Sequence, residues 1–446
     1  MNTTLSTRTF TRALLVPSLL AACGSPPEAA CPTVPVPAAS AAPVAVVATA
    51  PSAVPLPVVP APTPEPAGPD LIIVSVTNSA SFARTKESIT LTLDELEKVA
   101  PSLELRKTLV FDAAGTPVLS QVAATSAGAD PSELIFQADF IAGETKSFRL
   151  RAGERKLAPT SAYQVYGRFV RERHDDFAWE NDLVAHRMYG PDLETTKKEP
   201  LVSSGIDVWA KRVPRLLVNE WYMTDDYHQD HGDGADFYSV GKTRGCGGDG
   251  LWVKDKLSVS RNFTTSRVIA NGPIRLIFEL DYAPWDAGGV KVGETKRITL
   301  DAGSFFNRFE STFSTKKALP VAIGVAKHPG NAEVFDSGTE SLRVWEPADG
   351  KNGNYGCAVM LPPGSSGAEK QTDDNYLLVT SSKPGEPLRY FAGSTWDRAG
   401  HVTSADAWGE TVRKFAARLA WPLKVALVAG PGATPAPTPT PAPKAP

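Results

Sequence analysis

One short segment of the chain concentrates side chains that transfer protons. Residues 225–238 read Asp-Asp-Tyr-His-Gln-Asp-His-Gly-Asp-Gly-Ala-Asp-Phe-Tyr, and they include two of the six histidines of the chain. The glycines favour an exposed loop over a helix or strand. Imidazole, carboxyl and phenol groups crowded on a loop are suited to general acid–base chemistry or to metal binding. We therefore predict that His228, His231 and Tyr238 are catalytic.

A second segment, residues 177–190, carries groups that could hold a sugar. Trp179 could stack on a sugar ring, Glu180 and Asn181 could exchange hydrogen bonds with it, and Arg187 could bind a carboxylate or sulfate through two nitrogens. In a strand, residues 185, 187 and 189 would share one face and His186 would point to the other. The alternative interpretation of this segment is an edge strand in which the arginine and the glutamate form an ion pair with each other.

Two further segments could contribute to such a site. Residues 207, 209 and 211 are Asp, Trp and Lys, and a strand would place all three on one face. That face could form a carbohydrate groove. Alternatively, the segment is a half-buried strand with a surface ion pair. The glycines of residues 240–250 could let backbone N–H groups approach a ligand, or could simply make a flexible loop. Their spacing differs from that of a phosphate-binding loop.

Metal binding is an alternative use of the histidine loop. The spacing of His228 and His231 is feasible for a divalent ion, with further ligands from Asp226, Asp230 or Asp233. It matches neither a zinc metalloprotease helix nor a calcium-binding EF-hand. The leading hypothesis needs no cofactor. His328 and His401 are isolated in the sequence, and we predict that His328 joins the substrate-binding residues from another strand, although a structural role is open.

The elements that must position these residues are mostly strands. Between residues 70 and 429 the signals for strands are dense. Residues 71–76 and 88–93 are typical of buried strands, and residues 274–280, 295–300 and 305–313 alternate apolar and polar residues. Such alternation indicates half-buried antiparallel strands. The best helix candidate is residues 403–419, with Ser404 as its N-cap, and residues 94–100 predict one or two helical turns. We predict an all-β fold, a large antiparallel β-sandwich with few short helices, as one catalytic domain over residues 70–429.

The two ends of the chain differ from this body. Residues 1–22 have Arg8 and Arg12 before a short apolar run, which is typical of a secretory signal peptide. Leu-Ala-Ala-Cys at residues 20–23 predicts a bacterial lipoprotein lipidated at Cys23, and Gly24 favours the outer membrane, facing the periplasm or the cell surface. A cleaved signal with a chance cysteine is the alternative. Residues 23–69 read as a Pro/Ala-rich tether, and residues 430–446 as a Pro/Thr-rich disordered tail.

Charge and cysteine content limit the function classes. Loss of Arg8 and Arg12 with the signal peptide takes the formal net charge from −3 to −5, so the sequence has no basic footprint for nucleic acid. Local basic patches could still bind an acidic sugar. Cys246 and Cys357 are the cysteines of the predicted domain, and they could form a disulfide or remain two buried thiols.

The ordered set of motifs resembles one bacterial family of secreted proteins, DUF4861. The residues that carry the likeness are Trp179-Glu180-Asn181-Asp182 with Arg187-x-Tyr189-Gly190, Ser204-Gly205-Ile206-Asp207-Val208-Trp209, Tyr227-His228-x-Asp230-His231-Gly232-x-Gly234, and Gly241-x-Thr243-x-Gly245-Cys246-Gly247-Gly248. The resemblance implies a galactose-mutarotase-like supersandwich and a place among polysaccharide-degrading proteins. It further implies action on oligosaccharides that contain uronic acids, by lyase or dehydratase chemistry.

Three functions are compatible with these residues. The first is elimination next to a uronate carboxylate, with His228 or His231 as the base, Arg187 and Asn181 neutralising the carboxylate, and Tyr238 or the other histidine as the acid. The second is glycoside hydrolysis by paired carboxyl groups, Glu180 and an aspartate of the 225–236 loop. The third is a glycan-binding lipoprotein without catalysis, with tryptophans as stacking platforms: Trp179, Trp209, Trp221, Trp252 and Trp396.

Overall fold

The computed structural model describes residues 68–433, apart from residues 198–199 and 225–226. The predicted signal peptide, Cys23, nearly all of the tether and the tail after residue 433 lie outside the described residues. Within the described ranges, no helix is long and apolar enough to cross a membrane.

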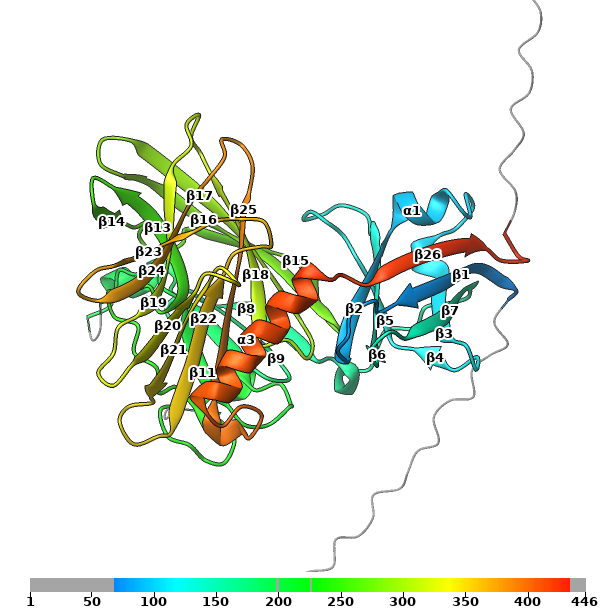
Figure 1. Cartoon of the computed structure of the whole chain (residues 1–446), viewed down its shortest axis with the longest axis horizontal. Helices are drawn as coiled ribbons and strands as arrows, with labels where there is room; N and C mark the ends of the chain where they lie inside the picture. The colour runs from blue at the N-terminus through cyan, green and yellow to red at the C-terminus, as the bar shows by residue number, and fades with distance from the viewer. Residues whose placement is uncertain (1–67, 198–199, 225–226, 434–446) are drawn as a thin grey trace, which may run out of the picture. The chain divides into compact units, whose positions relative to one another are not determined.

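The first part of the fold is a small β-module with its own hydrophobic core. A three-stranded sheet is built from β2 (Arg84–Thr92), β6 (Glu133–Phe140) and β5 (Ser120–Ala123). A five-stranded sheet has the order β26 (Lys424–Ala429), β1 (Asp70–Thr77), β7 (Thr145–Ala152), β3 (Thr108–Asp112) and β4 (Pro117–Val118). The last strand of the chain thus pairs with the first, red beside blue in Figure 1. Alternating apolar residues such as Ile72, Val74 and Val76 fill the core between these sheets.

The second part is a large antiparallel sandwich. Its eight-stranded sheet has the order β15 (Thr265–Asn271), β16 (Arg275–Asp286), β17 (Lys291–Asp301), β18 (Phe306–Phe313), β25 (Leu388–Trp396), β22 (Asn354–Met360), β21 (Ser341–Pro347) and β20 (Ala332–Asp336). A five-stranded sheet has the order β14 (Lys256–Ser258), β13 (Cys246–Val253), β19 (Pro320–Ala326), β24 (Asn375–Ser381) and β23 (Ala368–Gln371). Another has the order β12 (Gly234–Ala235), β11 (Asp207–Lys211), β10 (Ala185–Met188), β9 (Asp176–Asn181) and β8 (Val165–Val170).

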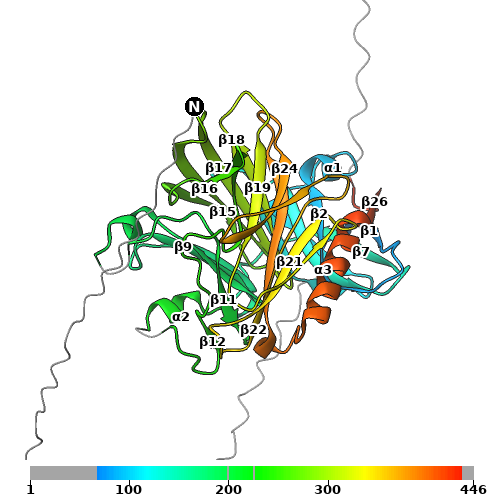
Figure 2. The same ribbon diagram turned by 60° about the vertical axis from the view of Figure 1, so that its left-hand side comes forward.

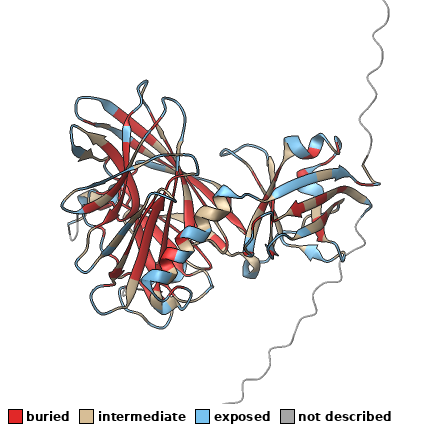
Figure 3. Ribbon diagram, in the orientation of Figure 1, coloured by how far each residue is buried: buried red, intermediate tan, exposed pale blue. Residues whose placement is uncertain are grey.

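Helices are few and short among the described residues. The α-helices are α1 (Leu93–Glu97), α2 (Val218–Tyr222) and α3 (Ala405–Ala420), and short 3-10 turns occupy Leu105–Lys107, Thr160–Ala162, Pro191–Thr195 and Asp397–Ala399. Ser404 caps α3, as predicted, through a hydrogen bond from the N–H of Ala407. Trp408 and Val412 bury one face of α3 against β21 and β22, and its other face is exposed (Figures 2 and 3). The predicted antiparallel β-sandwich with few short helices is therefore confirmed. Among the described residues the largest hydrophobic cluster fills the sandwich, and the second fills the small module.

Candidate functional site

The sheet β8–β12 presents two chemically different faces. In β10, His186 points into the core and Arg187 points to the opposite face, as the alternation predicts. Trp179 lies on the core face, where its ring stacks on His186 with 5.1 Å between centroids and its Nε1 donates to Asn307 Oδ1 at 2.8 Å. Because Trp179 is fully buried, it offers no ring face to a sugar in this structure.

The outer face of the sheet gathers three aspartates around Arg187. Arg187 Nε donates to Asp207 Oδ2 at 3.0 Å, and its Nη2 donates to Asp236 Oδ2 at 2.9 Å. Asp176 Oδ2 lies 3.9 Å from Nη1. Arg187 lies on β10, Asp176 and Asp207 lie on β9 and β11, and Asp236 directly follows β12. The guanidinium predicted to bind a substrate carboxylate is thus already occupied by carboxylates of the chain.

Burial raises the pKa values of the carboxyl groups in this cluster. It raises the pKa of Asp176 to about 7, although the charge of Arg187 works in the opposite direction. Burial, followed by the negative charge of Asp207, raises the pKa of Asp236 well above its usual range. Arg187 thus faces three buried carboxyl groups whose pKa values are all raised, mainly by burial.

The remaining predicted sugar contacts on this sheet are used by the protein itself. Glu180 is fully buried, accepts from Lys211 Nζ at 2.5 Å, and accepts from the N–H groups of Leu217 and Val218 at 2.6 Å each. These last two bonds fix the start of α2 over the sheet.

Asn181 and Trp209 are held in a similar way. The side-chain amide of Asn181 donates to the backbone carbonyls of Asp301 and Ser304 at 2.8 and 2.7 Å. The ring of Trp209 packs on Tyr227 with 5.6 Å between centroids, and it is 2% exposed. Both side chains therefore fix the fold around the cluster.

His228 is the member of the histidine loop that connects this cluster to solvent. Its ring packs on Tyr227, with centroids 4.4 Å apart, and its side chain is 61% exposed. Its Nδ1 lies 3.0 Å from the backbone carbonyl oxygen of Asp236, which can only accept a hydrogen bond. A proton on Nδ1 leaves Nε2 of the neutral ring as a base, and no partner of Nε2 is found in the described residues.

His231 is exposed on the same loop, and the described part of the chain provides no hydrogen bond to its side chain. Asp230 binds Arg212 at 2.6 Å and Asp233 binds Arg215 at 2.5 Å, so these two predicted metal ligands have other partners. Asp226 lies outside the described residues. Within the described ranges, no three His, Cys, Asp or Glu side chains converge as metal ligands do. Metal binding therefore remains a prediction.

Arg173 is a cation beside Tyr227 that sequence reasoning missed. Its guanidinium carbon lies 5.4 Å from the ring centroid of Tyr227, the ring on which His228 packs. Arg173 precedes two residues with left-handed backbone, His174 at φ 50° and Asp175 at φ 61°. Such dihedrals are uncommon outside glycine and mark a tight turn. The signal in the sequence was the dense run of charges over residues 171–176.

Tyr238 and His328 come together in a different place. Their ring centroids are 5.1 Å apart, and no ring contact or hydrogen bond within the described residues joins either of them to His228. The hydroxyl of Tyr238 is buried and has no hydrogen-bond partner in the part of the chain that the structure describes. His328 Nδ1 lies 3.0 Å from Glu346 Oε1, and its Nε2 lies 2.7 Å from the carbonyl oxygen of Ser239.

The second half of the glycine-rich segment is a packed strand, whereas Gly241 and Lys242 lie in an exposed turn before it. Residues 246–253 form β13, and Cys246 to Gly250 are buried. A Cβ atom on Gly248 would lie 2.6 Å from the carbonyl oxygen of Arg244, so the glycine is needed for close backbone packing and not for ligand binding. Cys246 and Cys357 are both buried free thiols in this structure, which agrees with the second alternative left by the sequence.

Comparisons with known proteins place the chain in a family. The family model of DUF4861, a domain of unknown function, matches residues 76–425. The chain is 29% identical over 370 residues to Uncharacterized protein P7 of Formosa agariphila, covering 80% of this chain and 93% of that protein.

Two solved structures from Enterococcus faecalis are also similar. A protein in the glycosyl hydrolase family 38 has a TM-score of 0.45 and 11% identity, and an alpha-mannosidase of strain V583 has a TM-score of 0.43 and 10% identity. Each comparison covers 80% of this chain, which spans about half of those longer proteins, 47% and 46%.

Proposed function

The chain belongs to the DUF4861 family, and we propose that it is a carbohydrate-active enzyme that performs β-elimination, as a lyase or dehydratase, on uronic-acid-containing oligosaccharides. The sugar class and the elimination chemistry are both implied by the resemblance of its motifs, and the residues of the site are compatible with that chemistry. The observation that carries the proposal is His228, an exposed imidazole whose Nδ1 faces a backbone carbonyl.

The first requirement of elimination is a base for the acidic proton next to the carboxylate. His228 Nε2 is suited to this step because the side chain is exposed and an imidazole nitrogen is a common general base. The hydrogen bond from Nδ1 to the Asp236 carbonyl fixes the tautomer and the ring orientation. Arg187 then acts as a positioning residue, since it holds the side chain of Asp236 in place.

The second requirement is a positive charge that stabilises the enolate-like state of the carboxylate. Arg187 is enclosed by aspartates, so we assign this role to Arg173, which is half-buried and shares the Tyr227 ring with His228. A planar guanidinium can bind both oxygens of a carboxylate.

The third requirement is an acid for the leaving oxygen. We assign it to His231, which is exposed on the same loop, because the hydroxyl of Tyr238 is buried. In the balanced step, His228 takes the proton from carbon, the C–O bond on the neighbouring carbon breaks, a C=C bond forms, and the leaving oxygen receives a proton from His231. Neither an oxidant nor a reductant is needed.

The alternatives have less support in the geometry. Hydrolysis by Glu180 needs that carboxyl group to reach a glycosidic bond, and Glu180 is fully buried in its ion pair with Lys211. Binding without catalysis needs accessible ring faces, whereas four of the five candidate tryptophans are at most 7% exposed: Trp179, Trp209, Trp221 and Trp396.

The proposal is tested by incubating the purified protein with saturated and unsaturated uronate-containing oligosaccharides and recording product masses and near-ultraviolet absorbance. We expect loss of one water, or a split that yields an unsaturated fragment. His228→Ala should lower the rate at least a hundredfold, because general-base catalysis contributes about 10² to 10⁴. Gln229→Ala, a change at the exposed neighbour, should leave the rate unchanged. Products that gain one water, or a fully active His228→Ala variant, would refute the elimination.

Location at the outer membrane through a lipid on Cys23 remains a proposal from the sequence, since Cys23 lies outside the described residues. Such an anchor would place the enzyme where oligosaccharides from polysaccharide breakdown arrive.

A further inference from the structure

A cleft lined by tyrosine and asparagine side chains lies at the β8 edge of the sheet β8–β12. This cavity, the tyrosine cleft, has a volume of about 290 Å³, and its lining includes two tyrosines, two asparagines and a glutamate: Tyr163, Tyr166, Asn219, Asn271 and Glu180. Its volume is close to the lower end of the range found for small-molecule pockets. None of these residues carries out a step of the proposed elimination.

The two tyrosine side chains are positioned by the strands and turns around them. Tyr166 lies on β8 directly opposite Glu180 of β9, so both side chains are on the outer face of the sheet. Tyr163 packs over Gly272, where an added Cβ atom would lie 2.4 Å from its ring carbon Cδ1. Both tyrosines are half-buried, so part of each side chain remains accessible to a ligand.

The two asparagines have different roles. Asn271 joins β15 to β8, because its Nδ2 donates to the carbonyl of Gly167 at 2.8 Å and its Oδ1 accepts from the N–H of Gly167 at 3.2 Å. Asn219 Oδ1 accepts from Arg168 Nε at 2.6 Å, whereas its Nδ2 has no acceptor among the described residues. The two tyrosine hydroxyls also lack hydrogen-bond partners within the part of the chain that the structure describes. One amide and two hydroxyls are therefore free to bind a ligand.

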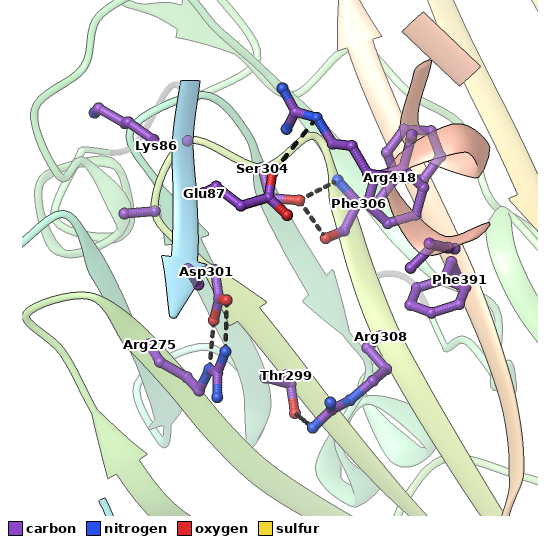
Figure 4. A pocket seen from close by; sticks show the side chains of 15 residues that line it. Lys86, Glu87, Arg275, Thr299, Asp301, Ser304, Phe306, Arg308, Phe391 and Arg418 are labelled. Atoms are coloured by element: carbon purple, nitrogen blue, oxygen red, sulfur yellow. Dashed lines mark hydrogen bonds and ion pairs between the residues drawn. The ribbon is translucent and has the colours of Figure 1, made fainter. Parts of the chain in front are cut away.

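Charge distinguishes the tyrosine cleft from the cavity drawn in Figure 4. That cavity, of about 210 Å³, is lined by several charged side chains, among them the ion pair of Arg275 with Asp301 at 2.6 and 2.8 Å. The charged residue in the lining of the tyrosine cleft is Glu180, and its two oxygens are bound by Lys211 Nζ and by the N–H groups at the start of α2. A charged ligand group would lose hydration in this cleft without gaining an opposite charge, so the cleft favours a neutral ligand.

The tyrosine cleft and His228 lie at opposite edges of the same sheet. Tyr166 is on β8, one edge strand, and His228 Nδ1 faces the carbonyl of Asp236, which directly follows β12, the other edge strand. Because neighbouring strands lie about 4.8 Å apart, β8 and β12 are separated by about 19 Å. A ligand in the cleft therefore stays clear of the proton transfers assigned to the histidine loop.

We propose that the tyrosine cleft binds a neutral sugar unit, with the rings of Tyr163 and Tyr166 against its C–H groups and the Asn219 amide and the phenol groups bound to its hydroxyls. A tyrosine combines an apolar ring with a polar group, and a sugar ring presents the matching combination. The choice of a sugar rests on the proposed function, whereas the preference for a neutral ligand rests on the cleft. The bound unit would be a neutral part of the glycan, distant from the uronate that reacts at His228.

The test is a saturation-transfer NMR titration of the whole protein with the methyl glycosides of glucose, galactose and xylose, and with those of glucuronate and galacturonate. We expect at least one neutral glycoside to bind, and Tyr163→Ala and Tyr166→Ala should each weaken it about tenfold because a packed ring is lost. Tyr166→Phe keeps the ring and should weaken binding only about threefold, the effect of one neutral hydrogen bond. Asn219→Ala, a change at an exposed residue that the fold tolerates, should have the same small effect.

Tyr376→Ala is the matched control, because Tyr376 is also a half-buried tyrosine on a strand, β24, and does not line the cleft. Circular dichroism confirms that each variant folds. Equal losses in Tyr376→Ala and Tyr166→Ala, no binding of any neutral glycoside at about 10 mM, or uronate binding that Tyr166→Ala weakens as strongly would overturn the proposal. Intact binding of a neutral glycoside without elimination would refute the proposed function alone. Elimination with unchanged glycoside binding in both alanine variants of the cleft tyrosines would refute this site alone.

Discussion

At the scale of single residues, His328 joins two segments of the chain through hydrogen bonds whose strength depends on pH. Both of its ring nitrogens face oxygen acceptors, Glu346 Oε1 and the carbonyl of Ser239, and only the imidazolium can donate to both. Burial disfavours that charge, but the hydrogen bond to Glu346 and its charge outweigh burial, so that the pKa of His328 is raised above 6.5. Its stabilisation is therefore complete below the pKa of the unfolded state and is lost as the pH rises through the raised value.

We expect His328→Gln to lower the free energy of unfolding by about 1 kcal/mol at pH 5.5, because charge-assisted hydrogen bonds are lost. The difference in the free energy of unfolding between the variant and the unchanged protein should be smaller at pH 8.5, where His328 of the unchanged protein also loses its charge. Urea unfolding at the two pH values measures this. If the difference in the free energy of unfolding stays constant or grows with pH, His328 does not act as a charged imidazolium in the folded protein.

Residue types indicated chemistry better than they indicated exposure. Alternation correctly placed Arg187 and His186 on opposite faces of β10, because side-chain direction in a strand follows from sequence parity. It could not tell that the Arg187 face lies under α2, because that cover depends on Glu180 accepting the N–H groups of Leu217 and Val218, far along the chain. Arg173 was missed for the same reason, since its proximity to Tyr227 is a tertiary contact.

At the scale of elements, β13 depends on glycine for packing. A Cβ atom on Gly248 would lie 2.6 Å from the carbonyl oxygen of Arg244 and 3.0 Å from both Gly205 Cα and the carbonyl oxygen of Ser204, and backbone atoms cannot move aside easily. We expect Gly248→Ala to lower the free energy of unfolding by about 2 to 3 kcal/mol. Gly293→Ala in β17 is the control, with Ser314 Oγ at 3.2 Å as its nearest neighbour, and should cost less than about 1 kcal/mol. Denaturant unfolding measures the free energy of unfolding of both variants. Equal decreases in the two variants would argue against tight packing of β13.

Local patterns predicted the elements that depend on local physics. The helix over residues 403–419 was found because Ser404 caps it and its apolar residues recur at helical spacing. The antiparallel strands were found from their alternation. The glycine-rich strand was not, because glycine signals backbone freedom in the sequence while its use here is to admit a neighbouring backbone.

At the scale of the whole molecule, the small module is closed by the two ends of the fold. β26 pairs with β1 from Ile72 opposite Ala429 to Thr77 opposite Lys424, and Leu427 packs against the module's core. No local pattern in the sequence indicates a pairing between strands so far apart along the chain.

A chain truncated after Leu423 tests this closure. Removing β26 leaves β1 as an unpaired edge strand and takes away the apolar contacts of Leu427, so the module should open more readily, by about 2 kcal/mol or more. Hydrogen exchange in peptides spanning residues 70–77 and 145–152 should then be up to about thirtyfold faster, while peptides from β17 and β18 keep their protection. The control ends at Ala433 and keeps β26, and we expect it to exchange like the full chain. Because β1 also pairs with β7, unchanged protection in the shorter chain would mean that β7 alone holds β1, and that the module forms without its C-terminal strand.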